Sequence, residues 1–221
     1  MTLQGKIYFI AGIGTDIGKT FLVEKLCRIL RGKKIAVKAV KPVASGFDIS
    51  DPNSDSAKIL VALGREISKN NLDEITPWQF FEAIAPHLAA EKLGQKIDFS
   101  EVKKFCQEEI LAAKNHDQFL FIEAAGGVMT PLNEEKTFLD LAAELEIPVL
   151  LVSANYLGSI SHTLCAVEAL KSKKVRIEKI IINEQSPLSQ QSSQVDIGSI
   201  VATVRNLSKI EVSLLANVSL R

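Results

Sequence analysis

Apolar and polar residues form alternating blocks along the chain, and the blocks predict strands and helices in turn. Short continuous apolar runs are typical of strands that are buried on both faces of a parallel sheet. These runs occupy residues 7–11, 33–40, 119–124, 148–153, 178–183 and 210–215. Runs with helical spacing of apolar residues fall between them, at 20–30, 57–63, 80–93, 100–113, 139–145, 159–171 and 195–207. The alternation predicts an α/β fold with a doubly wound, mostly parallel sheet of about seven strands and helices on both faces.

A few stretches depart from this alternation. Residues 64–78 are polar and are expected to be irregular, and the Ser- and Gln-rich segment 185–194 is expected to be a loop. Pro86 interrupts the pattern of 80–93 and is expected to kink or restart the helix. Ser100 is a candidate N-cap for the helix that follows. The sequence shows no repeat and no linker, so residues 1–221 are predicted to form a single domain.

The first predicted strand leads into a glycine-rich turn with the character of a phosphate-binding loop. Residues Gly12 to Thr20 read Gly-Ile-Gly-Thr-Asp-Ile-Gly-Lys-Thr, and a predicted helix follows them. Glycines let successive N–H groups point inward, and the helix N-terminus adds a partial positive charge. Lys19 can reach the β- and γ-phosphates, and the Thr20 hydroxyl can ligate Mg²⁺. The generic motif has a glycine where this chain has Ile13, so a glycine-rich turn with a solvated lysine is the alternative.

Other predicted strand ends carry candidate ligands as well. The segment Lys41–Gly46 combines a lysine with short polar side chains, which suits an anion, although an ordinary exposed lysine remains the alternative. Asp55 lies at or near a helix start, where it is either an N-cap or a metal ligand. Glu123 ends a buried strand, where a carboxylate is costly unless it is paired or binds an ion. For His87, a surface or capping role and a substrate contact are both open.

Taken together, these pieces resemble the dethiobiotin synthetase family. That family carries Gly-Thr-Asp-Thr-x-Val-Gly-Lys-Thr, Lys-Pro-Val-x-Ser-Gly, Ser-Asp, Pro-His, Glu-Gly-Ala-Gly-Gly and Leu-Gly-x-Ile-Asn-His. The equivalents here keep the same order over most of the chain: Gly12–Thr20, Lys41–Gly46, Ser54-Asp55, Pro86-His87, Glu123–Gly127 and Leu157–His162. The family's loop also has its first glycine where this chain has Gly12, which accounts for the unusual spacing. Departures from the family pattern are Ile13-Gly14, Ala124, Ser161 and Ser213.

The resemblance implies ATP- and Mg²⁺-dependent closure of a ureido ring. In that reaction 7,8-diaminopelargonate takes up CO₂ as a carbamate, the carbamate attacks the γ-phosphate of ATP, and the second amine closes the ring of dethiobiotin. The implied catalytic residues are Lys19, Lys41, Thr15 and Ser45, and the implied metal ligands are Thr20, Asp55 and Glu123. The implied nucleotide-binding residues are Gly12, Asp16, Ile17, Gly18, Lys19, Thr20, Phe21, Asp55, Glu123, Ala124, Ala125, Gly126, Asn183 and Glu184. The implied substrate-binding residues are Ser45, Pro86, His87, Ser159, Ile160 and Ser161. The resemblance also implies a homodimer whose subunits share the substrate site.

Composition narrows the range of partners. Lys plus Arg equals Asp plus Glu, at 26 each, so nothing favours binding to nucleic acid or to a membrane surface. The N-terminal residues lack the layout of a signal peptide, and no apolar run approaches the roughly 18 residues of a membrane span. A cytoplasmic protein is therefore expected.

Two other functions share parts of this pattern. Partitioning-type ATPase switches have the same loop and fold, but they carry an extra lysine early in the loop, where this chain has Gly14. A nucleotide-binding module without catalytic activity is the second alternative, because the loop departs from the family pattern. A ring-closure assay would separate all three functions.

Overall fold

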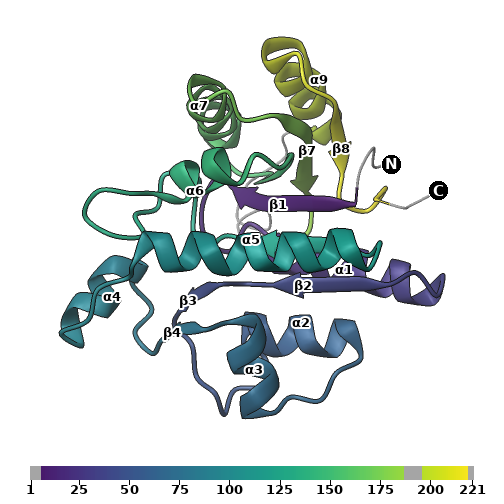
Figure 1. The fold of residues 1–221 in the computed structure, drawn as a ribbon. Coiled ribbons are helices and arrows are strands. Elements are labelled where there is room, and N and C mark those ends of the chain that lie inside the picture. Colours follow the sequence, from purple (N-terminus) through teal and green to yellow (C-terminus); the bar gives the residue numbers. More distant parts are fainter. Residues whose placement is uncertain (1–5, 187–195, 219–221) are drawn as a thin grey trace.

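The chain folds around a parallel sheet with the strand order β2-β5-β1-β6-β7-β8. Figure 1 shows the outer strands β2 and β8 on opposite sides of β1. The computed structural model describes residues 6–186 and 196–218. The strands of this sheet are β1 (Ile7–Gly12), β2 (Val37–Val40), β5 (Phe119–Glu123), β6 (Val149–Ala154), β7 (Ile177–Asn183) and β8 (Val212–Leu214). Every neighbouring pair is parallel. The α/β class and the doubly wound parallel sheet are confirmed, with 6 strands in the main sheet against the expected seven or so.

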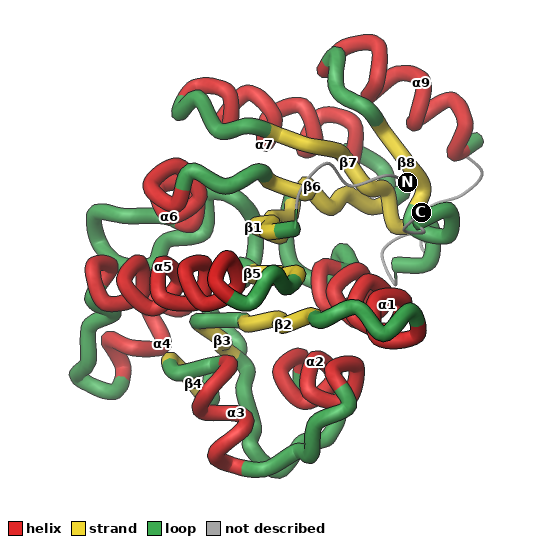
Figure 2. The backbone as a smooth tube through the Cα atoms, turned by 45° about the vertical axis from the view of Figure 1, so that its right-hand side comes forward, coloured by secondary structure: helices red, strands yellow, loops and turns green. Residues whose placement is uncertain are grey.

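Helices cover both faces of this sheet. They are α1 (Lys19–Gly32), α2 (Asp55–Leu63), α3 (Lys69–Ile75), α4 (Pro86–Lys92), α5 (Phe99–Asn115), α6 (Phe138–Leu145), α7 (Ser159–Ser172) and α9 (Ile197–Ser208). Helices α5, α6, α7 and α9 contact one another in turn, while α1 contacts β1, β2 and α2. Figure 2 shows α1 and α5 on opposite sides of β5. Because crossovers between parallel strands are right-handed, connections that run toward opposite sheet edges place their helices on opposite faces.

The strands β1 and β6 lie at the point where the connections change direction. They are hydrogen-bonded neighbours, and β1 leads to α1 on one face whereas β6 leads to α7 on the other. Open α/β sheets bind ligands beyond the carboxyl ends of their strands at such a point. The fold therefore places a binding crevice next to the glycine-rich turn that follows β1.

The segment between β2 and α5 is more ordered than the sequence predicted. Residues 64–78, expected to be irregular, contain α3, and Trp78 begins strand β4 (Trp78–Phe80). Helix α3 forms because Ser68 caps it and because Leu72 and Ile75 are buried. Strand β4 pairs with β3 (Val43–Ser45) in a small parallel sheet. The predicted helix 80–93 is correct only for α4, which begins at Pro86, a residue that suits the first turn.

Helix caps also differ from the prediction. Asp98, not Ser100, caps α5, because its carboxylate accepts hydrogen bonds from the N–H groups of Ser100 and Glu101 at 2.7 and 3.3 Å. Ser54 caps α2, which leaves the carboxylate of Asp55 available for other contacts. Residues 187–194 of the predicted polar loop and the predicted helix start at Val195 lie outside the described residues. None of the helices that the structure describes is long and apolar enough to cross a membrane.

Candidate active site

The second half of the glycine-rich turn is held by the end of β7. Gly18 precedes α1 with φ of 100°, a left-handed conformation that favours glycine. A side chain at this position would also collide with the amide of Asn183. That amide donates to the Ile17 carbonyl at 3.0 Å, and the Ser186 hydroxyl donates to the Asp16 carbonyl at 2.9 Å. The turn is thus fixed in one shape by residues far away in the sequence.

The first half of the turn lies against the chain that follows β5. The N–H of Val128 donates to the Gly12 carbonyl at 2.9 Å. A Cβ atom on Gly127 would stand only 3.2 Å from the carbonyl oxygen of Ile13. The glycines after Glu123 were expected to admit a ligand, and Gly127 instead admits the backbone of the turn.

Lys19 spans the turn from the first position of α1. Its side chain is buried, and its Nζ donates to the carbonyl oxygen of Gly14 at 2.8 Å. Burial and the neighbouring ammonium of Lys41 lower the pKa of Lys19 from 10.5 to about 8, against the opposing effect of nearby carboxylates. A buried ammonium whose only hydrogen bond in the described residues goes to a carbonyl oxygen is suited to receive an anion such as a phosphate.

A cluster of charged and polar side chains forms beside Lys19. The Nζ of Lys41 donates to Oε1 of Glu123 at 2.8 Å and to Oδ2 of Asp55 at 2.5 Å. The Thr20 hydroxyl donates to the same oxygen of Glu123 at 2.7 Å. Lys41 follows β2 and Glu123 ends the adjacent β5, while Thr20 and Asp55 stand in the first turns of the contacting helices α1 and α2. Neighbouring parallel strands end at the same sheet edge, which is why these groups meet.

The ion pairs favour the charged forms of Lys41 and Asp55. Burial disfavours the charge on Lys41, but Glu123 and Asp55 outweigh that effect and raise the pKa of Lys41 above its usual value. Burial alone would raise the pKa of Asp55, but Lys41 and the Thr20 hydroxyl lower it. Because a buried ion pair contributes little net stability, a cluster of this kind at a ligand-binding edge is better explained by function.

The cluster has room for a cation. Oε2 of Glu123 is buried and has no hydrogen-bond partner among the described residues. An unpartnered carboxylate oxygen in a buried position is costly unless a ligand satisfies it. In the described part of the chain no group of three or more His, Cys, Asp and Glu side chains is placed to hold a metal. A metal held here would therefore need the Thr20 hydroxyl and oxygens of a bound nucleotide besides the two carboxylates, which is the donor set typical of Mg²⁺ on a triphosphate.

These groups face a cavity of about 630 Å³. Most of the residues implied by the resemblance line it: Thr15, Asp16, Gly18, Lys19, Thr20, Phe21, Lys41, Ser45, Asp55, Pro86, Glu123, Ala125 and Gly126. Gly12, Ile17 and Ala124 do not line it. They are buried behind the turn, and Gly12 packs so closely that a side chain there would meet Ile17 and Lys19.

The cavity also has lining residues that the sequence did not single out. These are Glu24, Lys58, Ala83, Ile84, Ala85 and Thr130. Helical spacing could have identified two of them, because Glu24 lies four residues after Thr20 and Lys58 three residues after Asp55. The other four depend on how the segment before α4 and the chain after β5 fold over the site, which no local pattern specifies.

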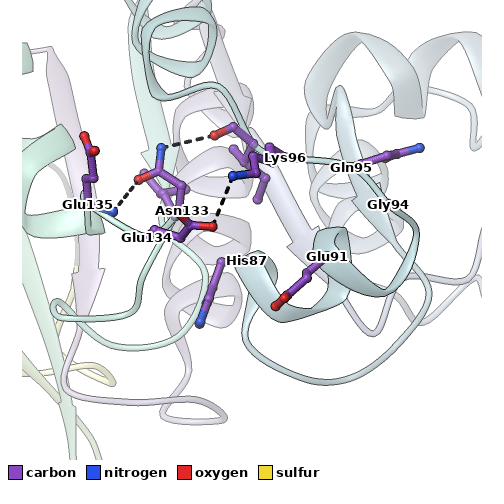
Figure 3. Close-up of a pocket in the computed structure, with 10 residues that line it drawn as sticks. His87, Glu91, Gly94, Gln95, Lys96, Asn133, Glu134 and Glu135 are labelled. Carbon is purple, nitrogen blue, oxygen red and sulfur yellow. Dashed lines mark hydrogen bonds and ion pairs between the residues drawn. The ribbon is translucent and has the colours of Figure 1, made fainter.

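His87 points to a different place from its neighbour Pro86. It lines a second pocket of about 540 Å³, between α4 and the chain at 132–135 (Figure 3). Hydrogen bonds from Asn133 to the Ile97 carbonyl and from Lys96 to Glu134 join the chain at 132–135 to the segment that follows α4. Nδ1 of His87 is buried and has no partner among the described residues. The structure therefore does not bring His87 to the cavity that holds the lysines.

Asn183 and Glu184, which the resemblance implies as nucleotide-binding residues, have protein partners. Asn183 holds the glycine-rich turn, as described above, and also accepts a hydrogen bond from the N–H of Gln185 at 3.0 Å. The carboxylate of Glu184 accepts hydrogen bonds from the N–H groups of Leu215 and Ala216 at 3.2 and 3.0 Å. Asn183 and Glu184 thus hold the backbone of the glycine-rich turn and of the chain after β8 in place.

Residues Ser159, Ile160 and Ser161 lie at the start of α7 and not on the 630 Å³ cavity of the same chain. Within the described residues, the N–H groups of Ile160 and Ser161 donate to no backbone carbonyl before the helix, and the buried hydroxyl of Ser159 has no hydrogen bond. The adjoining turn is closed by a hydrogen bond of 2.8 Å between the Tyr156 hydroxyl and Nδ1 of His162. The start of α7 is therefore a set of hydrogen-bond donors that lies apart from the 630 Å³ cavity of the same chain.

The fold and the phosphate-binding turn define a P-loop nucleotide-binding protein of the α/β class. Solved structures of similar fold include the cell division protein FtsY of Thermotoga maritima, with a TM-score of 0.51 and 13% identity over 95% of this chain. FtsY of Mycoplasma mycoides gives a TM-score of 0.51 and 16% identity over 97% of this chain. The chain covers 61% of each of these structures, and at such identities the similarity concerns the fold alone.

The family is shown by sequence similarity. A family model described as an AAA domain matches residues 6–219. The ATP-dependent dethiobiotin synthetase BioD of Acidiphilium cryptum is 40% identical over 82% of this chain and 81% of its own length. The protein of the same name from Methylobacterium nodulans is 41% identical over 80% of each chain. The chain belongs to the dethiobiotin synthetase family, which confirms the resemblance and decides against a partitioning-type switch.

Proposed function

We propose that this protein is an ATP-dependent dethiobiotin synthetase. It converts 7,8-diaminopelargonate, CO₂ and ATP to dethiobiotin, ADP and phosphate. The observation that carries the proposal is the meeting of two buried lysines, Lys19 and Lys41, in one cavity with Thr20, Asp55 and Glu123. Phosphoryl transfer depends mainly on positioning and on electrostatic stabilisation, and this cavity supplies both.

The glycine-rich turn binds the triphosphate in this proposal. Its inward N–H groups and the N-terminus of α1 face the phosphates, and Lys19 exchanges the Gly14 carbonyl for phosphate oxygens. The fixed shape of the turn means that little ordering is needed when the nucleotide binds.

Thr20, Asp55 and Glu123 are the residues that would hold Mg²⁺. The ion, when bound with ATP, neutralises charge on the β- and γ-phosphates. The Thr20 hydroxyl and Oε2 of Glu123, which has no partner among the described residues, offer oxygens to the ion, while Asp55 remains half exposed and can turn. Lys41 balances the two carboxylates when the ion is absent.

Lys41 and Ser45 face the part of the cavity that is left for the second substrate. One amine of the substrate takes up CO₂ to form a carbamate, and its oxygen attacks the γ-phosphorus while ADP leaves. The second amine then attacks the carbonyl carbon of the mixed anhydride, and phosphate leaves as the ring closes. In this proposal Lys41 stabilises the negative charge that moves from carbamate to phosphate, and the hydroxyls of Thr15 and Ser45 hydrogen-bond the carbamate.

A second subunit completes the substrate site in this proposal. The start of α7 offers the N–H groups of Ile160 and Ser161, which donate to no backbone carbonyl of the described residues and suit a carboxylate, yet it does not line the cavity of its own chain. A homodimer would place this helix start over the partner's cavity, where it would bind the carboxylate of the diamino acid.

Ring closure tests the function directly. The purified protein is incubated with MgATP, bicarbonate and 7,8-diaminopelargonate, and dethiobiotin and ADP are quantified together. Equal amounts of the two products are expected, and omission of the diamine should abolish ADP release. Release of ADP without dethiobiotin would contradict the proposal and would leave a simple ATPase. Dilution tests the shared site. Sedimentation gives the concentration at which the dimer dissociates, and the activity per subunit should fall below that concentration.

A further inference from the structure

Two charged residues outside the proposed ligand set line the same cavity. Glu24 lies one helical turn beyond Thr20 on α1, and Lys58 lies one turn beyond Asp55 on α2. Residues three or four positions apart lie on the same face of a helix, so each charge stands behind a proposed Mg²⁺ ligand. Helices α1 and α2 pack against each other, which brings these two residues to the same side of the cavity.

Lys58 differs from the other two lysines of this cavity. Lys19 donates to a carbonyl oxygen, and Lys41 is paired with two carboxylates. Lys58 is partly buried, and within residues 6–186 and 196–218 its ammonium has no ion pair within 4.0 Å. Its charge still helps to lower the pKa of Asp55. Lys58 is therefore a cation of the cavity that no carboxylate of the described chain neutralises by direct contact.

Glu24 supplies a charge of the opposite sign. Its side chain is only 16% exposed, and Oε2 accepts a hydrogen bond of 2.9 Å from Arg28. Oε1 accepts no hydrogen bond from the described residues, so it remains available to the cavity. Burial raises the pKa of Glu24, while the charges of Arg28 and Lys58 lower it. The carboxylate thus responds to the same cation that acts on Asp55.

We propose that Glu24 and Lys58 set the Mg²⁺ affinity of the active site from behind its ligands, with opposite signs. Glu24 favours a hydrated divalent cation, because its free oxygen can accept hydrogen bonds from water bound to the ion. Lys58 disfavours the same cation by repulsion. The inference rests on the proposed function, since it takes Thr20, Asp55 and Glu123 as the metal ligands.

Binding of Mn²⁺ in the presence of ADP tests this inference without turnover. Free and bound Mn²⁺ are distinguished by electron paramagnetic resonance in the parent protein, Glu24→Gln, Lys58→Met and the double variant. We expect Glu24→Gln to weaken Mn²⁺ binding about tenfold and Lys58→Met to tighten it several-fold, about the scale of one nearby charge. The double variant should bind Mn²⁺ nearly as the parent does.

Matched controls remove the same charges elsewhere. Lys104 and Glu108 form an exposed pair on α5, outside the cavity, so Glu108→Gln and Lys104→Met change only the net charge. Mn²⁺ affinities of the Glu24 and Lys58 variants that match these controls would overturn the inference. So would a Lys58→Met protein with unchanged Mn²⁺ affinity and a raised KM for the diamino acid, which would make Lys58 a substrate contact. Failure of the proposed function is a different result, namely a parent protein that binds Mn²⁺ with ADP and forms no dethiobiotin.

Discussion

Two neighbouring strand-to-helix turns in this protein share one backbone design. The turn from β1 to α1 and the turn from β6 to α7 leave adjacent strands, and each leads into a helix of 14 residues. Gly18 and Gly158 precede these helices with φ of 100° and 97°, and neither helix start has a side-chain cap. Each turn thus presents a helix N-terminus to the same edge of the sheet, where anions are favoured.

The two turns differ in what surrounds them. At α1, Lys19 and Thr20 are buried against Glu123 and the lysine that follows β2. At α7, the first residues are Ser159, Ile160 and Ser161, and a hydrogen bond between the Tyr156 hydroxyl and Nδ1 of His162 spans the turn. The two turns share the backbone geometry that favours anions. Only the first is surrounded by buried charges that neighbouring strands deliver, and it is the one to which we assign phosphoryl transfer.

Removing a buried charge beside the turn from β1 to α1 should have the largest effect on catalysis. Lys41→Gln should lower the rate of ring closure by roughly 10²-fold or more, the scale seen when one preorganised electrostatic donor is lost. ATP affinity should stay near the parental value, because Lys19 and the turn remain. Dethiobiotin formation and ATP binding are measured side by side.

A control on the same strand sharpens this prediction. Lys38 belongs to β2 but pairs with Glu74 and Glu109 away from the cavity, so Lys38→Gln should leave ring closure unchanged. Near-parental turnover in Lys41→Gln would place the catalytic centre elsewhere.

The proposed metal ligand Glu123 should have the next largest effect. Glu123→Gln keeps the size of the side chain and its contact with Thr20 but removes the charge that attracts a cation. The Mg²⁺ concentration needed for half-maximal turnover should rise about tenfold to a hundredfold. The melting temperature should fall as well, because the buried ammonium of Lys41 loses one of its two carboxylate partners. Titration of activity with Mg²⁺ at fixed ATP measures the first quantity and calorimetry the second. An unchanged Mg²⁺ requirement would exclude Glu123 as a ligand.

Substitution of Gly18 and Gly158, which precede α1 and α7, tests the comparison between the two strand-to-helix turns. Gly18→Ala and Gly158→Ala impose the same left-handed backbone strain, ~1 kcal/mol or somewhat more. Only the first also drives a Cβ atom into Asn183, because the nearest atom to a Cβ at position 158 is 3.5 Å away on His162. ATP affinity, measured by calorimetry, should fall about thirtyfold in Gly18→Ala and remain parental in Gly158→Ala. Equal losses of ATP affinity would mean that the two turns are not distinguished by the packing of β7.

The smallest expected effect is a pH dependence of nucleotide binding. The pKa of Lys19 is lowered to about 8 in the protein without nucleotide, so the ammonium is charged below pH 8 and is lost as the pH rises above it. ATP affinity should therefore be full at pH 7 and about tenfold weaker at pH 9, with proton uptake on binding between these values. Calorimetry in buffers of different ionisation enthalpy measures the uptake.

The same pKa has a consequence of opposite sign for folding. Between pH 8 and 10.5 the unfolded chain holds the Lys19 proton more tightly, so this residue's contribution to stability increases as the pH rises through that window.

A variant that cannot lose its charge is the control for the pH dependence of nucleotide binding. Lys19→Arg stays charged, so its ATP affinity at pH 9 should equal its ATP affinity at pH 7. A parental fall in that variant would assign the titration to another group.

The sequence alone predicted those features of the protein that depend on residues close together in the chain. The apolar runs identified every strand of the main sheet, because strands buried on both faces must be apolar throughout. The order of motifs from Gly12 to His162 identified the family, and the strand ends identified Lys41 and Glu123. Each of these inferences rests on residues close together in the chain or on the rule that parallel strands end at one edge.

Tertiary structure decided what depends on contacts between distant segments. Helix α3 forms in a polar stretch because Leu72 and Ile75 find a core to bury them. His87 turns into a second pocket although Pro86, its neighbour in sequence, lines the cavity. Glu24 and Lys58 come to the same side of the cavity because α1 packs against α2. Local sequence sets which conformations a segment favours, but the direction of a side chain at a helix start or in a loop is set by what packs against it, and those partners lie tens of residues away.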